Sequence, residues 1–268
     1  MVIQHNIAAI NSYRNLGTNQ SSLNKNLEKL SSGYRINRAG DDAAGLAISE
    51  AMRSQINGLN QATKNANDAI GLIQTAEGAL TETHAMLQRL TTLASQSANG
   101  TYNSVARGNL QKEVSRLLEE INRISNDTDF NGVKPISGGS ITFQIGPTSG
   151  EILNLPTCGM TTTDLSISDI NVSSLAGGNS AIDKIKAAIN TVSSYRADLG
   201  AAQNRLEHTV NNLKVTSENI TAAESRIRDT DMADEITAFT KNNILLQASQ
   251  SMLAQSNSVP QSILSLLG

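Results

Sequence analysis

The stretch IDKIKAAINTVSSYRADLGAAQNRLEHTVNNLKVTSENITAAESRI, residues 182–227, decides the fold class. Its aliphatic side chains recur with helical spacing, at Ile182, Ile185, Ile189, Val192, Leu199, Leu206, Val210, Leu213, Ile220 and Ile227. Polar residues occupy the remaining positions of this register, namely Arg196, Gln203, Ser217 and Glu224. A heptad register that continues over more than six repeats is typical of a coiled coil. The stretch therefore predicts one long helix that packs along its whole length.

Two stretches that precede it have the same kind of periodicity. The first runs through Met52, Ile56, Leu59, Thr63, Ala66, Ile70, Ile73, Leu80 and Leu87, with Glu77 and His84 at the polar positions. The second, shorter one consists of Leu110, Val114, Leu117, Ile121 and Ile124. Proline is absent from all three stretches, and each of the two long helices would span roughly 70 Å. We therefore expect a mainly α fold, in which long antiparallel coiled-coil helices from both chain ends form a rod.

The middle of the chain, at about residues 135–179, has a different pattern. Ile141, Phe143 and Ile145 alternate with polar residues, a turn sequence follows at 146–150, and a second apolar segment lies at 152–155. Alternation on both sides of a turn is typical of a β-hairpin. The sequence thus predicts a small β-hairpin and loop excursion between the helices.

The two chain ends are apolar and nearly uncharged. His5 is the only ionisable side chain before Arg14, and no charged side chain occurs from Asn242 to Gly268. Both ends keep helical apolar spacing, at Ile3, Ile7, Ile10, Tyr13, Leu16, Leu23, Leu27 and Leu30 and at Met232, Ile236, Phe239, Leu246 and Leu253. Because exposed helices normally carry a charged face, we expect these ends to become ordered and buried when copies of the chain assemble. The alternative is that the ends pair only with each other inside a monomer.

The composition excludes several classes of function. The 268-residue chain has a net charge of −3, which gives no footprint for nucleic acid or anionic membranes, and it has no apolar run long enough for membrane insertion. Cys158 is the only cysteine, and no cysteine or histidine cluster has zinc-ligand spacing. There is no His-Glu-x-x-His motif and no phosphate-binding glycine loop, so we expect neither an enzyme nor a cofactor. The N-terminus lacks the basic start and apolar stretch of a Sec-type signal.

Several separated motifs resemble those of bacterial flagellins. They are EKLSSGYRINRAGDDAAGLAIS at 28–49, DTDFNGV at 127–133, FQIG at 143–146, NILLQA at 243–248, VPQ at 259–261 and LSLL at 264–267. The resemblance implies a structural subunit that polymerises with copies of itself into the extracellular flagellar filament for motility. It also implies export by the flagellar type III route without a cleaved signal peptide.

The resemblance also implies a layered domain organisation. Residues 1–42 with 229–268 would form an inner helical layer that orders on assembly, and residues 43–228 would form a rod domain. The excursion at about 135–179 has room for the hairpin but not for the outer domains of larger flagellins. The chain is therefore expected to be a short, minimal form.

Two groups of candidate site residues come from matching flagellin motifs. Positions matching the patch bound by the Toll-like flagellin receptor of vertebrates are Gln88, Arg89, Leu93 and Glu113. In the loop from Ser31 to Asp42, which would join the two layers, Arg35 and Arg38 are candidates for charge pairs between subunits. Asp41 and Asp42 belong to the same assembly loop, or instead cap the helix that follows. The stretch 30–49 also resembles the epitope read by plant flagellin-sensing receptor kinases.

The C-terminal helix is the third candidate site. Its apolar residues Ile236, Phe239, Leu246 and Leu253 would serve terminal assembly and binding of a flagellar secretion chaperone. Filament cap and hook-junction proteins are further expected partners. Two alternative functions stay open: a hook–filament junction protein, and a secreted host-receptor ligand without a motility role.

Overall fold

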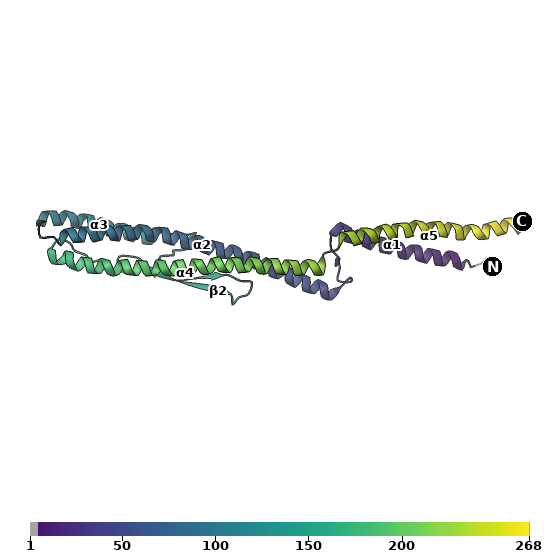
Figure 1. Cartoon of the computed structure of the whole chain (residues 1–268), viewed down its shortest axis with the longest axis horizontal. Helices are drawn as coiled ribbons and strands as arrows, with labels where there is room; N and C mark the ends of the chain where they lie inside the picture. The colour runs from purple at the N-terminus through teal and green to yellow at the C-terminus, as the bar shows by residue number, and fades with distance from the viewer. Residues whose placement is uncertain (1–4, 268) are drawn as a thin grey trace. The chain divides into compact units, whose positions relative to one another are not determined.

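The computed structural model describes residues 5–267, so Ile3 of the predicted N-terminal seam lies outside the described residues. The elements are α1 (Ile7–Ser32), α2 (Ala43–Ser97), α3 (Ser104–Asp127), β1 (Ser137–Gln144), β2 (Ile152–Gly159), α4 (Leu175–Arg228) and α5 (Met232–Leu267) (Figure 1). The predicted fold class, mainly helical with a small β-hairpin in the middle, is confirmed.

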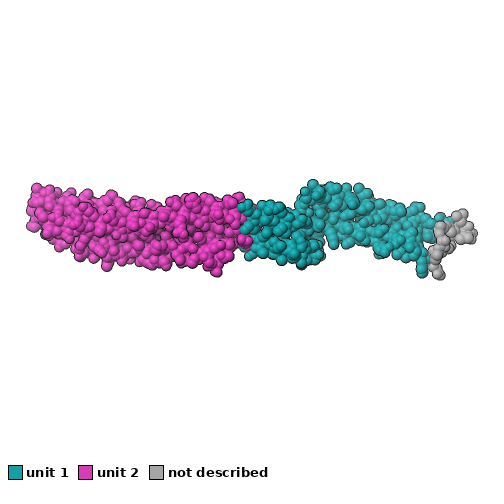
Figure 2. Space-filling view, turned by 60° about the horizontal axis from the view of Figure 1, so that its bottom comes forward, with its two compact units in different colours: residues 1–54, 219–268 teal, residues 55–218 magenta. Residues whose placement is uncertain are grey.

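The chain divides into two compact units (Figure 2). Unit 1 comprises residues 1–54 and 219–268, and unit 2 comprises residues 55–218. The long helices α2 and α4 contribute residues to both units. The expected layer boundaries at 42/43 and 228/229 concern the assembled filament and stay a prediction.

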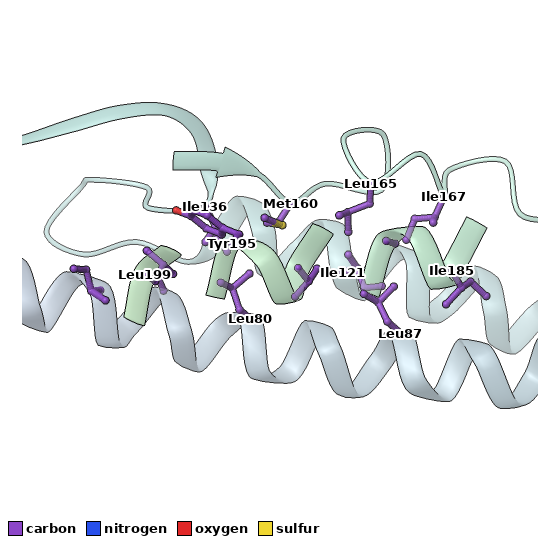
Figure 3. Packing of buried hydrophobic residues seen from close by; sticks show 14 of the residues in the cluster. Leu80, Leu87, Ile121, Ile136, Met160, Leu165, Ile167, Ile185, Tyr195 and Leu199 are labelled. Carbon is purple, nitrogen blue, oxygen red and sulfur yellow. The ribbon is translucent and has the colours of Figure 1, made fainter. Parts of the chain in front are cut away.

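The core of unit 2 is formed by α2, α3, α4 and the segment around the hairpin. Figure 3 shows Leu80 and Leu87 of α2 facing Ile185 and Leu199 of α4 across this core. The non-helical segment adds the fully buried side chains of Ile136, Met160 and Ile167. Alanines make up much of the helix contact, at Ala66, Ala69, Ala76, Ala181, Ala188 and Ala202. Small side chains allow helix backbones to approach closely, so this core needs few aromatic rings.

The buried register of α4 starts one residue earlier than the aliphatic pattern predicts in its first half. The buried residues are Ala181, Ile185, Ala188, Val192, Tyr195, Leu199, Ala202, Leu206, Val210 and Leu213. Ile182, Ile189, Arg196 and Gln203, which the sequence places in the seam, are half-buried at its edge. The prediction of polar residues inside this seam is wrong at two positions, because Tyr195 and Ala202 occupy them instead.

The β-hairpin is antiparallel and lies against the helices. Ile141 is opposite Leu155 and Phe143 is opposite Leu153, with both leucines of β2 buried. The hairpin is fixed at its beginning by the buried hydroxyl of Tyr195, which donates to the carbonyl oxygen of Pro135 (3.0 Å). Burial raises the pKa of Tyr195 to about 12, so the hydroxyl keeps its proton at neutral pH.

In unit 1, α1 and α5 run antiparallel and pack against each other (Figure 1). The side chain of Asn6 caps α1 by accepting from the N–H of Ala9 (3.1 Å), and Gly33 ends it with a φ of 75°. Leu16, Leu23 and Leu30 lie on the side that faces α5. The remaining described members of the predicted seam, Ile7, Ile10, Tyr13 and Leu27, are exposed. The predicted single apolar seam is therefore divided between an inner and an outer face.

Candidate recognition and assembly surfaces

Three of the four candidate receptor residues share one exposed face of unit 2. Both Nε and Nη2 of Arg89, on α2, donate to Oε1 of Glu113 on α3, at 2.8 and 2.7 Å. Gln88 is exposed beside Arg89, and its Nε2 lies 3.0 Å from Nε2 of His84. The pair thus holds charged groups from two helices at a defined place on the surface.

Leu93, the fourth candidate, does not lie on this surface. Its side chain is fully buried and belongs to the core with Leu90 and Ala94. A partner docked on the Arg89–Glu113 face of the folded chain cannot contact it directly. Leu93 therefore supports the helix packing beneath the candidate surface.

Arg35 makes its contacts within the chain. Its Nη2 donates to the carbonyl oxygens of Ile227 (2.6 Å) and Arg226 (3.3 Å), and its backbone N–H donates to Arg228 O (2.7 Å). Carbonyls in the last turn of a helix lack intrahelical partners, so Arg35 serves as a C-terminal cap of α4. Its expected charge pair with another subunit stays a prediction.

Arg38, Asp41 and Asp42 have three different tasks in the loop before α2. Arg38 Nε donates to Oε1 of Glu28 (2.7 Å). Oδ2 of Asp41 accepts from the backbone N–H groups of Arg38 (3.0 Å) and Asn37 (3.2 Å), and these bonds hold the pKa of the Asp41 carboxyl below its ordinary value. Only Asp42 caps α2, because its Oδ1 accepts from the N–H of Gly45 (2.9 Å).

A second charged cluster in unit 1 was not predicted from the sequence. Arg228 lies over the ring of Tyr34, 4.7 Å from its centroid, and its Nη1 donates to Oε1 of Glu50 (2.6 Å). The Arg228 side chain is only 12% exposed, and its hydrogen bond lowers the pKa of the Glu50 carboxyl. No sequence signal joins positions 34, 50 and 228, since they meet only after the loop folds back.

The four candidate residues of α5 do not share one face. Phe239, Leu246 and Leu253 are half-buried on the side that faces α1. Ile236 is 52% exposed, as are further apolar side chains of α5 such as Ile244 and Met252. A partner of the single chain would therefore meet Ile236 directly and the other three only at their edges.

Among the described residues there is no group of three or more metal-binding side chains, and no helix is long and apolar enough to cross a membrane. The chain instead presents paired terminal helices with apolar side chains left at the surface. These features define a helical structural protein with assembly surfaces.

The family of the chain follows from its similarity to known proteins. The family model "Bacterial flagellin N-terminal helical region" matches residues 3–140, and "Bacterial flagellin C-terminal helical region" matches residues 182–267. The chain is 50% identical to the flagellin of Bacillus subtilis (strain 168) and 51% identical to that of Halalkalibacterium halodurans, in both cases over 100% of each chain. Its fold is similar to the crystal structure of Bacillus cereus flagellin, with a TM-score of 0.52 and 32% identity, covering 60% of this chain and 94% of that one.

The chain belongs to the bacterial flagellin family. It is a structural, non-enzymatic subunit that polymerises into the extracellular flagellar filament used for motility. Its length matches that of its relatives, which makes it a short form of the family.

Proposed function

We propose that this filament subunit is also a ligand of the Toll-like flagellin receptor of vertebrates, bound through Gln88, Arg89 and Glu113. The observation that carries the proposal is the Arg89–Glu113 pair, whose side chains are 53% and 42% exposed. Arginine is enriched among residues that dominate binding energy at protein interfaces. Because the pair joins two helices, its geometry is set before a partner arrives, which lowers the entropic cost of binding.

Replacing Arg89 tests the proposal. Arg89→Ala should raise the Kd of the monomer for the receptor ectodomain at least about ten-fold, since it removes a central charged contact. Exposed ion pairs contribute little to stability, so the thermal unfolding midpoint should hardly change. The matched control is Arg116→Ala on α3, where Arg116 makes a similarly exposed pair with Glu119 (2.7 Å). An Arg89→Ala variant that binds as tightly as the unchanged chain refutes the proposed site.

A flagellar secretion chaperone is the second partner we propose, and α5 is its binding element. The exposed apolar side chains of this helix, Ile236 among them, support the proposal because a groove would shield them from premature assembly. Titration calorimetry of the chaperone with the full chain and with Ile236→Asp tests it. Equal affinities would contradict it.

The alternatives kept open by the sequence are distinguished by different measurements. A hook–filament junction protein would fail to extend seeded filaments, whereas a filament subunit extends them. A secreted receptor ligand without a motility role would leave swimming unchanged when the chain is deleted. Filament cap and hook-junction proteins stay expected partners at the two ends of the polymer.

A further inference from the structure

The contact between α1 and α5 alternates apolar and polar layers with heptad spacing. The apolar layers contain Leu16, Leu23 and Leu30 of α1 and Phe239, Leu246 and Leu253 of α5. The polar layers contain Ser12, Asn19 and Asn26 of α1 and Glu235, Asn242, Ser249 and Ser256 of α5. All of these side chains are at least half-buried, although the chain carries more apolar residues on other faces of both helices.

The polar layers are connected by hydrogen bonds across the two helices. Asn19 Nδ2 donates to Ser249 Oγ (2.9 Å), and Asn6 Nδ2 donates to the carbonyl oxygen of Ser256 (2.7 Å). With its amide oriented to match its neighbours, Asn26 donates to Oε1 of Glu235 (3.1 Å) and accepts from Nδ2 of Asn242 (3.0 Å). Each asparagine therefore has a partner set of its own.

The apolar layers cannot fix how far one helix is slid along the other. Leu16, Leu23 and Leu30 are identical and seven residues apart, so a slip of one heptad would pair leucine layers with apolar layers again. The same slip would take Asn26 away from Glu235 and Asn242 and would break the Asn19–Ser249 bond. Buried polar groups that lose their partners are costly, so only the polar layers distinguish the observed pairing from its shifted forms.

We infer that Asn19 and Asn26 are positioning residues that set the register of the α1–α5 pair in the filament. A buried asparagine at a core position is known to specify register in coiled coils at some cost in stability. In a subunit this register determines where the exposed side chains of α1, such as Ile10, lie relative to those of α5, such as Met252. It therefore determines the surface that one copy offers to the next.

The register can be measured in filaments by distances between two spin labels. Cysteines placed at the exposed positions Asn15 of α1 and Gln247 of α5, in a Cys158→Ser background, would carry the labels. Labelled chains are diluted into an excess of unlabelled ones, so that only distances within one chain are recorded. A slip of one heptad moves the helices by about 10 Å, which this method resolves.

The expected result for the unchanged seam is one narrow distance distribution. Asn19→Leu with Asn26→Leu should give a second population displaced by about 10 Å, or one broad distribution. Asn24→Leu, at an exposed position of the same helix, should keep the single narrow distribution. Asn19→Ala with Asn26→Ala removes the amides without adding bulk and should broaden the distribution too. A single unshifted distance in the variants that incorporate would overturn the inference, and so would incorporation of neither seam variant together with a broad distribution in Asn24→Leu.

Discussion

Glu50 shows how one carboxylate holds the loop between α1 and α2 against the end of α4. Its Oε1 accepts from Arg228 (2.6 Å) and from Arg53 (3.1 Å), and Arg228 in turn lies over Tyr34. The hydrogen bond from Arg228 lowers the pKa of the Glu50 carboxyl in the folded chain. The ionised form is therefore bound more strongly in the folded state than in the unfolded one.

This depressed pKa predicts a loss of local stability in acid. The contribution of the pair is fully present above the unfolded carboxyl's pKa, about 4.5, and disappears as the pH falls through the lower folded value. Amide exchange of the segment 33–42, measured by mass spectrometry at pH 7 and below pH 4 and corrected for intrinsic rates, should show loss of protection only in acid. Glu50→Gln should be less protected at pH 7 and should change less with pH. A variant with the same pH profile as the unchanged chain would contradict this account.

At the scale of single residues the sequence predicted some roles correctly and could not reach others. That an aspartate just before an apolar helical run caps the helix follows from local chemistry, and Asp42 does so. Which of two adjacent aspartates caps depends on the loop, and Asp41 bonds back to Asn37 and Arg38 instead. The contact of Arg35 with the end of α4 joins residues about 190 positions apart, and no local pattern encodes it.

At the scale of the elements, α4 makes a sharp test of register possible. Ala188 is 1% exposed, whereas its neighbour Ala187 is exposed. Ala188→Asp would bury a carboxylate in an aliphatic core without a partner, which should destabilise unit 2 by at least about 3 kcal/mol. Ala187→Asp makes the same chemical change on the solvent side and should shift stability by no more than about 0.5 kcal/mol.

Urea unfolding followed by circular dichroism would measure both variants. The two should differ strongly in midpoint, although they are adjacent in sequence and identical in charge. Similar midpoints would mean that the seam of α4 does not run through Ala188.

Periodicity predicted the existence and approximate extent of the long helices but not which side of each seam is buried. Ile182 and Ala181, or Ile189 and Ala188, are both apolar neighbours, and hydrophobicity alone favours the isoleucines. The structure buries the alanines because α4 faces α2 and the hairpin segment together, and close packing against both requires small side chains in the centre. For α1, two faces have helical spacing, and the choice between them depends on partners that the local sequence does not specify.

At the scale of the whole molecule, the chain separates the contacts made within one copy from those left for other copies. Within unit 1 the terminal helices use leucines and hydrogen-bonded amides for their mutual contact. Ile7, Ile10 and Tyr13 stay 62%, 59% and 70% exposed in the single chain. Exposed apolar groups in contiguous rows are characteristic of interaction surfaces. In a polymer with heterologous contacts between identical subunits, these side chains are the ones we expect neighbouring copies to cover.

Ile10 gives the most direct test of this separation. Ile10→Asp should leave the unfolding midpoint of the monomer within about 0.5 kcal/mol of the unchanged chain, because the side chain is already in water. The same change should raise the critical concentration for polymerisation at least about ten-fold, since assembly would bury an unpaired carboxylate. Ile10→Leu keeps an apolar side chain of similar volume and should polymerise almost normally. Light scattering of seeded filaments measures the critical concentration. If Ile10→Asp polymerises as readily as Ile10→Leu, then this face of α1 stays in solvent in the filament, and the pairing of α1 with α5 is all that the terminal helices contribute to it.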